Sequence, residues 1–327
     1  MIFSEAKWNG GAEIKRFVNV SAALSWKKME NPLYTAFHTY IVPVVGEKMA
    51  EKIVTLYNGE YSDIDAKLIE ICQFANANLA FWNDFDALSL RITDAGFQRQ
   101  ESENGTFKPA FKYQEDNLRR GFKNKGFNHL DGIIDFLFAH VDEYPEFKES
   151  ETYKIQTSSI VKNTAEVNDV YYINNSRLVY LRLSAHFRYA EEMELAPAIG
   201  DSMYDKLVSW LKGELPEEDG AKMERLRIAC SHFIVSKAVK KLLQETGSIT
   251  DRGLYFSSVE ASGEGNQNFK PVDMDRLQVQ IQNVENDATV YLSALTRLIR
   301  NNFSEFYVGD PAEVYNRDNN GKKTFWA

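Results

Sequence analysis

The sequence has few of the residues from which metal sites and disulfide scaffolds are built. It contains two cysteines, Cys72 and Cys230, without a CxxC pair, and five histidines without an HExxH or ExxH motif. Paired cysteines and His–carboxylate spacings are the usual signatures of zinc sites, disulfide frameworks and di-iron bundles. We therefore expect no bound metal or cofactor, and a reducing compartment.

The chain also lacks long apolar runs and a basic domain. No stretch approaches 18 consecutive apolar residues, and the N-terminus lacks the apolar run of a signal peptide, so we expect a soluble protein without a membrane partner. The net charge is −9, and both halves are acidic. General binding to nucleic acid is therefore not expected, because it depends on Lys and Arg that neutralise phosphates.

Two stretches of the chain are near copies of each other. Residues 41–60 read IVPVVGEKMAEKIVTLYNGE and residues 195–214 read LAPAIGDSMYDKLVSWLKGE, aligned without a gap at an offset of 154. Seven of 20 positions are identical, where ordinary composition would give roughly one or two. ITDAGF and ITDRGL, then FKP and FKP, match further along. The chain is predicted to be a tandem duplication.

The apolar spacing predicts a mainly α fold, in which each copy is a helical bundle with a small β-hairpin. Along residues 65–88 apolar side chains recur at steps of three and four, which indicates one buried helix face. Short strands are expected at 12–21 and 165–174. Helices are expected at 32–41, 47–57, 65–88, 110–123 and 131–141, and again at 178–195, 201–211, 221–245 and 274–300.

Glycines and prolines mark the expected corners. Pro43 and Gly46, like Pro197 and Gly200, are predicted to end one helix and redirect the chain into the next. Gly96 and Gly253 are predicted to take a positive φ in the hairpin turns.

These matches divide the chain into five parts. They are an N-terminal arm (1–11), a first helical unit (12–150), a linker (151–164), a second helical unit (165–307) and a C-terminal tail (308–327). The tail is polar but ends in Phe325 and Trp326, which we expect to dock elsewhere. Arms of this kind typically become ordered on a partner chain.

No group of residues points to catalysis, so we expect a protein that is not an enzyme. The Asp63/Asp65, Asp84/Asp86 and Asp273/Asp275 pairs could hold a cation, but helix capping explains them more simply. The cluster of Glu191, Glu192 and Glu194 is not expected to act as a general acid and base. Cys72 and Cys230 fall at equivalent positions on apolar helix faces, which favours a packing role.

One basic stretch is a candidate interface. Lys112, Arg119, Arg120 and Lys123 lie close together, while the corresponding part of the second copy is acidic. A solvated helix face is the simpler reading. The functional reading is a contact face for an acidic partner, or a ring lumen through which DNA passes without sequence-specific binding.

The order of helix, PxxG corner, helix, long helix, ITDxG turn, FKP and final helices resembles a family of uncharacterised proteins from Bacteroidetes and their phages and prophages. Each half is also similar in layout to the adaptor proteins of tailed-phage head-to-tail connectors, although single-unit adaptors are about half as long. This resemblance implies a virion structural protein, made in the bacterial host cytoplasm, that forms a ring with itself and contacts portal and tail proteins.

Two other functions fit the same sequence. A cellular helical adaptor or regulator could bind a peptide or small ligand between the two units. An enzyme with its site between the copies is the least favoured, because the non-repeated polar residues converge on no recognised chemistry.

Overall fold

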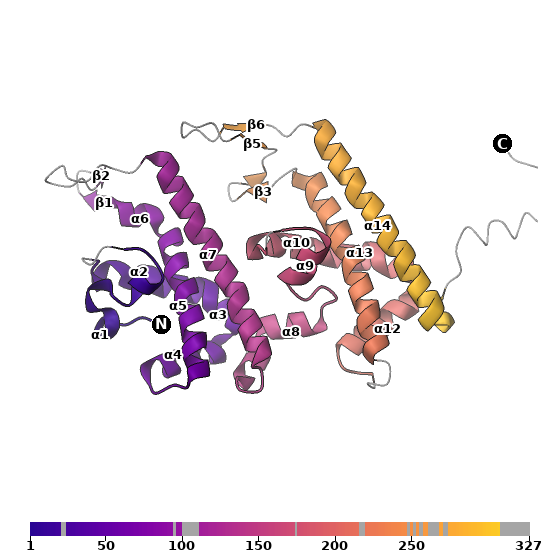
Figure 1. Cartoon of the computed structure of the whole chain (residues 1–327), viewed down its shortest axis with the longest axis horizontal. Helices are drawn as coiled ribbons and strands as arrows, with labels where there is room; N and C mark the ends of the chain where they lie inside the picture. The colour runs from indigo at the N-terminus through magenta and orange to yellow at the C-terminus, as the bar shows by residue number, and fades with distance from the viewer. Residues whose placement is uncertain are drawn as a thin grey trace, which may run out of the picture.

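Helices make up most of the described chain in the computed structural model, as the apolar spacing predicts (Figure 1). The structure describes residues 1–20, 24–93, 96–99, 111–173, 175–215, 220–246, 249–250, 253–254, 258–260, 268–270 and 274–307. The C-terminal tail, with Phe325 and Trp326, lies outside the described residues.

The elements follow each other in a similar order in the two halves. The first half contains α1 (Glu5–Trp8), 3-10 turns at Asn9–Gly11 and Ile14–Arg16, α2 (Trp26–Ala36), the π-helical turn η3 (Phe37–Ile41), α3 (Val42–Val45), α4 (Glu47–Asn58), α5 (Asp63–Asn83), α6 (Phe85–Ser89), β1 (Leu90–Thr93), β2 (Gly96–Arg99), α7 (Lys112–Ala139) and the 3-10 helix η4 (Pro145–Glu149). The second contains α8 (Glu151–Ser158), α9 (Thr164–Val170), α10 (Arg177–Ala190), the π-helical turn η5 (Glu191–Leu195), α11 (Ala196–Ile199), α12 (Asp201–Leu211), α13 (Gly220–Thr246), β3 (Ile249–Thr250), β4 (Gly253–Leu254), β5 (Ser258–Glu260), β6 (Asn268–Lys270), α14 (Met274–Asn302) and the 3-10 turn η7 (Ser304–Phe306).

Each half has a hydrophobic core of its own. One core gathers side chains between Ile2 and Phe147, and the other gathers side chains between Ile160 and Phe303. The long helices α5 and α7 pack together in the first half, as α13 and α14 do in the second (Figure 1). Two separate cores built around equivalent helix pairs fit two tandem units.

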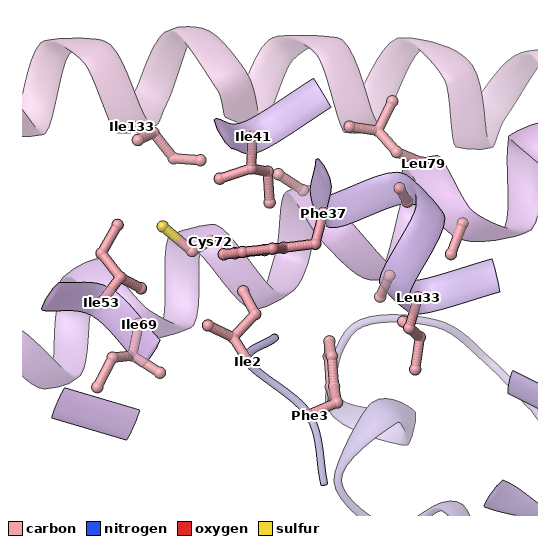
Figure 2. Close-up of a cluster of buried hydrophobic side chains, with 14 of the residues drawn as sticks. Ile2, Phe3, Leu33, Phe37, Ile41, Ile53, Ile69, Cys72, Leu79 and Ile133 are labelled. Atoms are coloured by element: carbon pink, nitrogen blue, oxygen red, sulfur yellow. The ribbon is translucent and has the colours of Figure 1, made fainter. Parts of the chain in front are cut away.

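The two cysteines belong to these cores. Cys72 lies beside the ring of Phe37 in the first core (Figure 2), and both Cys72 and Cys230 are fully buried. Burial raises the pKa of both thiols. The cysteines are therefore packing residues with little thiolate character.

The first residues of the chain do not form a separate arm, contrary to the prediction for residues 1–11. Ile2 and Phe3 are buried in the first core, within the cluster that Figure 2 draws. The Ile2 carbonyl accepts a hydrogen bond of 2.8 Å from Gln73 Nε2, and Trp8 Nε1 donates to the Leu24 carbonyl at 2.7 Å. The prediction was wrong because these apolar residues fill space that the helices of the first unit leave open.

Residues 151–164 are likewise not a loose linker. They form α8 and the start of α9; Tyr153 packs against the first core, and Ile160 and Val161 are buried in the second. Ser150 caps α8 by accepting a hydrogen bond from the Tyr153 N–H at 3.1 Å. The segment therefore joins the units as packed structure, although its composition is polar.

The strands predicted at 12–21 and 165–174 are also corrected. The first segment contains a 3-10 turn at Ile14–Arg16, and the second contains helix α9. Asn163 supplies the N-cap of α9, since its side-chain oxygen accepts from the Glu166 N–H at 3.0 Å. Local capping thus outweighs the β-branched and aromatic composition that favoured strands.

Helix α7 runs unbroken through Gly121 and Gly126, where the sequence predicts a break between 123 and 131. A Cβ at Gly126 would lie 2.6 Å from Leu79 Cγ of α5, whereas a Cβ at Gly121 would meet nothing within 4 Å. Gly126 is therefore a packing glycine that lets α5 and α7 approach each other closely.

Short antiparallel strands lie where the hairpins are predicted. Strand β1 pairs with β2, from Leu90 opposite Arg99 to Thr93 opposite Gly96, and β3 pairs with β4. Strands β5 and β6 form a third pair. The connecting residues 94–95 and 251–252 lie outside the described residues, so the hairpin turns, and the positive φ of Gly96 and Gly253, stay predictions.

A buried ion pair joins the two units. Arg177, the first residue of α10, lies 3.2 Å from a carboxylate oxygen of Asp131 on α7, and both side chains are largely buried. Leu178 packs against the core of the first unit. Burial raises the pKa of Asp131, and Arg177 acts in the opposite direction. The start of α10 is thereby fixed on α7.

The close approach at Gly126 predicts a stability difference between two glycine variants. Gly126→Ala and Gly121→Ala gain the same helix propensity, but only Gly126→Ala forces a methyl group against buried Leu79. We expect Gly126→Ala to be less stable than Gly121→Ala by about 1–3 kcal/mol in urea unfolding. Equal midpoints and slopes would contradict the packing role of Gly126.

Candidate interaction surfaces

The two corners have the same geometry in both units. Gly46 has φ 84° and ψ 154°, and Gly200 has φ 84° and ψ 142°. Each glycine N–H closes the last turn of the preceding short helix, at 2.8 Å from the Val42 carbonyl and 2.9 Å from the Ala196 carbonyl. This backbone region is open almost only to glycine, which explains why a glycine stands at each corner.

The prolines act differently from the prediction. The first helix of each unit does not end before Pro43 or Pro197, because a π-helical turn precedes each proline and the helix continues to the glycine. In the first unit the Val42 N–H donates to the Phe37 carbonyl, five residues back. The five-residue turn lies directly before the proline, which lacks an N–H and whose ring would clash with a carbonyl of the preceding helical turn.

The basic residues of α7 lie along its first half. Arg119 forms an ion pair of 3.2 Å with Asp86 and lies over the Phe85 ring, and Lys123 lies over the Trp82 ring. Arg120 is exposed. Lys112 is the first residue of α7, and its side chain lies outside the described residues.

Apolar side chains accompany these basic residues, and the sequence reasoning missed them. Phe111 is 69 % exposed, Tyr113 is 45 % exposed and Leu118 is 54 % exposed. The rings of Phe111 and Tyr113 stack at a centroid distance of 5.9 Å. We call these three residues, with Arg119 and Arg120, the α7 patch.

The second unit lacks an equivalent of the α7 patch. Equivalent core positions of α7 and α14 differ by 162, as in Ile133 and Leu295. At this offset the α7 patch corresponds to Asp273, Asp275, Gln280, Ile281 and Gln282. Glu285, part of the acidic stretch predicted here, instead forms ion pairs with Lys237 and Lys240 of α13.

A second exposed apolar surface lies on the outer face of α10 and its π turn. Leu181, Ala185, Tyr189 and Met193 recur at steps of four and are all exposed, Met193 to 61 %. The buried residues of α10, such as Leu183 and Phe187, lie on the opposite side. We call the four exposed residues the α10 stripe.

The first unit lacks an equivalent of the α10 stripe. The buried positions of α2 and α10 match at the offset of 154, as in Leu33 and Phe187. At this offset the stripe corresponds to Lys27, Asn31, Thr35 and Thr39. The apolar residues of the α7 patch and of the α10 stripe thus correspond to polar residues in the other unit.

Glu191 occupies the π turn at the position of buried Phe37 in the first unit. Burial, followed by the nearby charge of Glu192, raises the pKa of Glu191 to about 7. Arg188 forms an ion pair of 2.7 Å with Glu192, which lies four residues further along the chain. The first core has a phenyl ring where the second has a carboxyl group that titrates near neutrality.

The second unit also buries a charged network. Arg227 of α13 is 2 % exposed, forms ion pairs of 2.7 Å with Glu166 and Glu224, and donates to the Ile160 carbonyl. In the first unit, Glu13 at the position of Glu166 accepts hydrogen bonds from Tyr57 and Gln73. Both glutamates tie the start of a unit to its long helix.

Other candidate sites have structural explanations. Asp65 belongs to a capping box with Ser62 and also accepts a hydrogen bond of 2.8 Å from the Tyr144 hydroxyl. Within the described ranges, no group of three or more His, Cys, Asp or Glu side chains could hold a metal ion. No helix in the part of the chain described here could cross a membrane. A half-open pocket of about 30 Å³ is lined by residues of the second unit, among them Ile199 and Tyr307.

A comparison with protein families matches two segments of the chain, residues 41–157 and 195–318, to one family model, described as a family of unknown function (DUF6712). The chain belongs to the DUF6712 family. The two matched segments begin at Ile41 and Leu195, which are equivalent residues of the two π turns. No curated protein and no solved structure matches the chain.

The segments that match DUF6712 begin after α2 and α10. The family model therefore covers each corner and the helices that follow it, and the second segment starts two residues beyond Met193. The α7 patch lies inside the first matched segment, whereas the α10 stripe precedes the second.

The corner geometry predicts a destabilised first unit in Gly46→Ala. The new methyl group would meet a strained backbone and the Ser150 side chain, 3.0 Å from its Cβ. We expect a loss of about 1–3 kcal/mol in thermal or urea unfolding. Gly220→Ala, where a Cβ meets nothing within 4 Å, is the control. Equal stability of the two variants would show that the corner tolerates a side chain.

The position of Glu191 predicts a pH-dependent stability. Its pKa is about 7 in the fold and 4.5 as the ordinary value, so the folded state holds the proton more tightly than the unfolded state. The free energy of unfolding should therefore fall as the pH rises through this interval. Glu191→Gln should remove this part of the slope, measured by urea unfolding at several pH values.

The control for this experiment is Glu30→Gln, since Glu30 is exposed on α2. It should keep the slope of the unaltered protein. A Glu191→Gln variant with an unchanged slope would show that the carboxyl group is solvated.

Proposed function

We propose that this DUF6712 protein is a non-enzymatic structural protein of a virion. In this proposal it is a head-to-tail connector or head-completion adaptor that assembles into a ring between portal and tail. It is made in the bacterial host cytoplasm and becomes part of the virion.

One observation carries the proposal: two units with similar interiors have different apolar exteriors. The shared corners and cores give two copies of one scaffold, and the ion pair of Arg177 with Asp131 fixes them against each other. The α7 patch and the α10 stripe then expose large apolar side chains on different units. Exposed patches of this kind are typical of surfaces that bind other proteins.

Finer features of the proposal concern the individual contacts. The small hairpin predicted in each unit and the tail ending in Phe325 and Trp326 would contact portal or tail proteins. In the proposed ring, basic residues of α7 would line a lumen through which DNA passes without sequence-specific recognition. No membrane takes part.

The alternative is a cellular adaptor or regulator that binds a peptide or small ligand between its units. This function needs a pocket lined by residues of both units. The pocket described above is lined by residues of the second unit, among them Ala198, Thr296 and Phe306. The exposed apolar residues on both units are what favours the assembly function.

The experiment first identifies a portal gene in the genome that encodes this chain, and then tests co-assembly of the two proteins. We expect the purified protein to form rings in electron micrographs and to sediment with assembled portal, because the proposed adaptor acts between portal and tail. An unrelated portal is the control. A protein that leaves its own portal unbound would contradict the connector role.

A further inference from the structure

The half-open pocket of the second unit lies where a helix packs in the first unit. Helix α11 corresponds to α3, and α14 corresponds to α7, at the offsets of 154 and 162 that align the two units. In the first unit α8 packs on α3 and η4, and Tyr153 of α8 stacks on Phe138 of α7 at a centroid distance of 5.3 Å. The pocket is lined from the corresponding elements by Ala198, Ile199, Thr296, Ile299, Phe306 and Tyr307.

The positions that line the pocket are more deeply buried in the first unit. Ile134 is 1 % exposed and Tyr144 is 2 % exposed. Their counterparts at the offset of 162, Thr296 and Phe306, are only half-buried. The first unit therefore covers surface that the described part of the second unit leaves partly open.

The two units remain equivalent beyond the end of α14. Lys52 lies over the Tyr144 ring at 5.3 Å, and Lys206 lies over the Phe306 ring at 4.8 Å. These pairs match each other at the same offsets of 154 and 162. The correspondence therefore holds in space up to Phe306, next to Tyr307, the last residue that the structure describes.

The sequence that follows continues this correspondence. At the offset of 162, residues 313–315 (EVY) match residues 151–153 (ETY), which begin α8. The DUF6712 match likewise runs to residue 157 in the first unit and to residue 318 in the second. The family model thus includes α8 and the residues that correspond to it.

These residues also carry the signals of a helix. Asp310 precedes Pro311, and Glu313 stands three residues after Asp310. An N-cap aspartate, a proline at the first helical position and a glutamate at the third are typical of a helix start. Asn320 and Gly321 are typical of a helix end. The sequence therefore predicts a helix over residues 311–319.

The apolar residues of this segment match the covered side of α8. In α8, residues 152–153 are half-buried and residues 154–155 are exposed. The counterparts of the half-buried pair are Val314 and Tyr315, whereas those of the exposed pair are the polar residues 316–317. The segment therefore has apolar side chains at the positions that α8 turns towards its unit.

We propose that residues 311–319 form the counterpart of α8 and pack across the pocket of their own chain, with Tyr315 in the place of Tyr153. The contact depends on the first turn of the helix, because Asp318 stands where α8 has the buried Gln156. A pocket of about 30 Å³ holds only a small group, so the helix lies over it rather than inside it. This inference goes beyond the proposed function and does not depend on it.

The proposed contact divides the tail into a packed part and a free end. Phe325 follows Gly321 by four residues, which span at most about 14 Å. The aromatic end would therefore stay close to the second unit while remaining open to a partner. A polar composition does not argue against the packed part, since residues 151–164 are also polar and are packed.

Hydrogen exchange of the full chain, followed by mass spectrometry, tests the contact. The amides of residues 312–319 should exchange roughly tenfold or more slowly than in a synthetic peptide of residues 308–327, because packed helices protect their amides. Val314→Ser with Tyr315→Ser should return this exchange to the rate of the peptide, since these are the side chains assigned to the contact.

A variant of the pocket distinguishes a packed helix from one that forms alone. Ala198 is exposed and lines the pocket. Ala198→Lys should therefore also release residues 312–319, because a long charged side chain would stand in the contact. A helix that forms without packing would keep its protection in this variant.

Two matched controls should keep the protection. Asn316→Ser with Arg317→Ser makes the same kind of change at the positions that correspond to the exposed side of α8. Asn283→Lys adds a lysine at an exposed position of α14, about 20 Å along the helix from Thr296. Protection in the unaltered chain should not depend on the protein concentration.

Four results would overturn the inference. They are exchange of residues 312–319 at the rate of the peptide in the unaltered chain, protection that survives either test variant, loss of protection in either control, and protection that falls on dilution. The last result would show that a second copy supplies the helix. Portal binding is not a readout of this experiment, so the inference and the proposed function stand or fall separately.

Discussion

The missing N–H of one proline in each unit constrains the fold around it. A π turn comes directly before each of Pro43 and Pro197, which lack the N–H of a regular helix, and the helix ends at a glycine three residues later. The π turn places Phe37 in one core and Glu191 at the same position in the other. The next helix, α4 or α12, begins directly after the glycine. The turn and the glycine together therefore set the directions of three successive helices in each unit.

The two units keep this interior and change their surroundings. Core positions such as Leu33 and Phe187 exchange one apolar residue for another, with Phe37 and Glu191 as an exception. Outer positions such as Lys27 and Leu181 exchange a polar residue for an apolar one. The two copies thus share a scaffold and differ in the residues that they expose. The two segments that match the family begin at equivalent residues, Ile41 and Leu195, of the two π turns.

Much of the helical framework could be predicted from the sequence, because apolar residues at steps of three and four mark α4, α5, α12 and α13 within a few residues. Packing against distant residues could not be predicted. Gly126 resembles a helix breaker until Leu79 lies against it, and Ile2 and Phe3 resemble an arm until the first core surrounds them. The basic residues of α7 were found from charge alone. Neighbouring Phe111 and the α10 stripe were missed, because an apolar helix residue is usually buried.

The ion pair between Arg177 and Asp131 gives the last long helices of the two units different charge properties. Ser293 and Arg297 stand on α14 where Asp131 and Asp135 stand on α7. An arginine that docked on α14 as Arg177 docks on α7 would meet a cation instead of a carboxylate. The carboxylate seat that α7 provides for the start of α10 is therefore particular to the first unit.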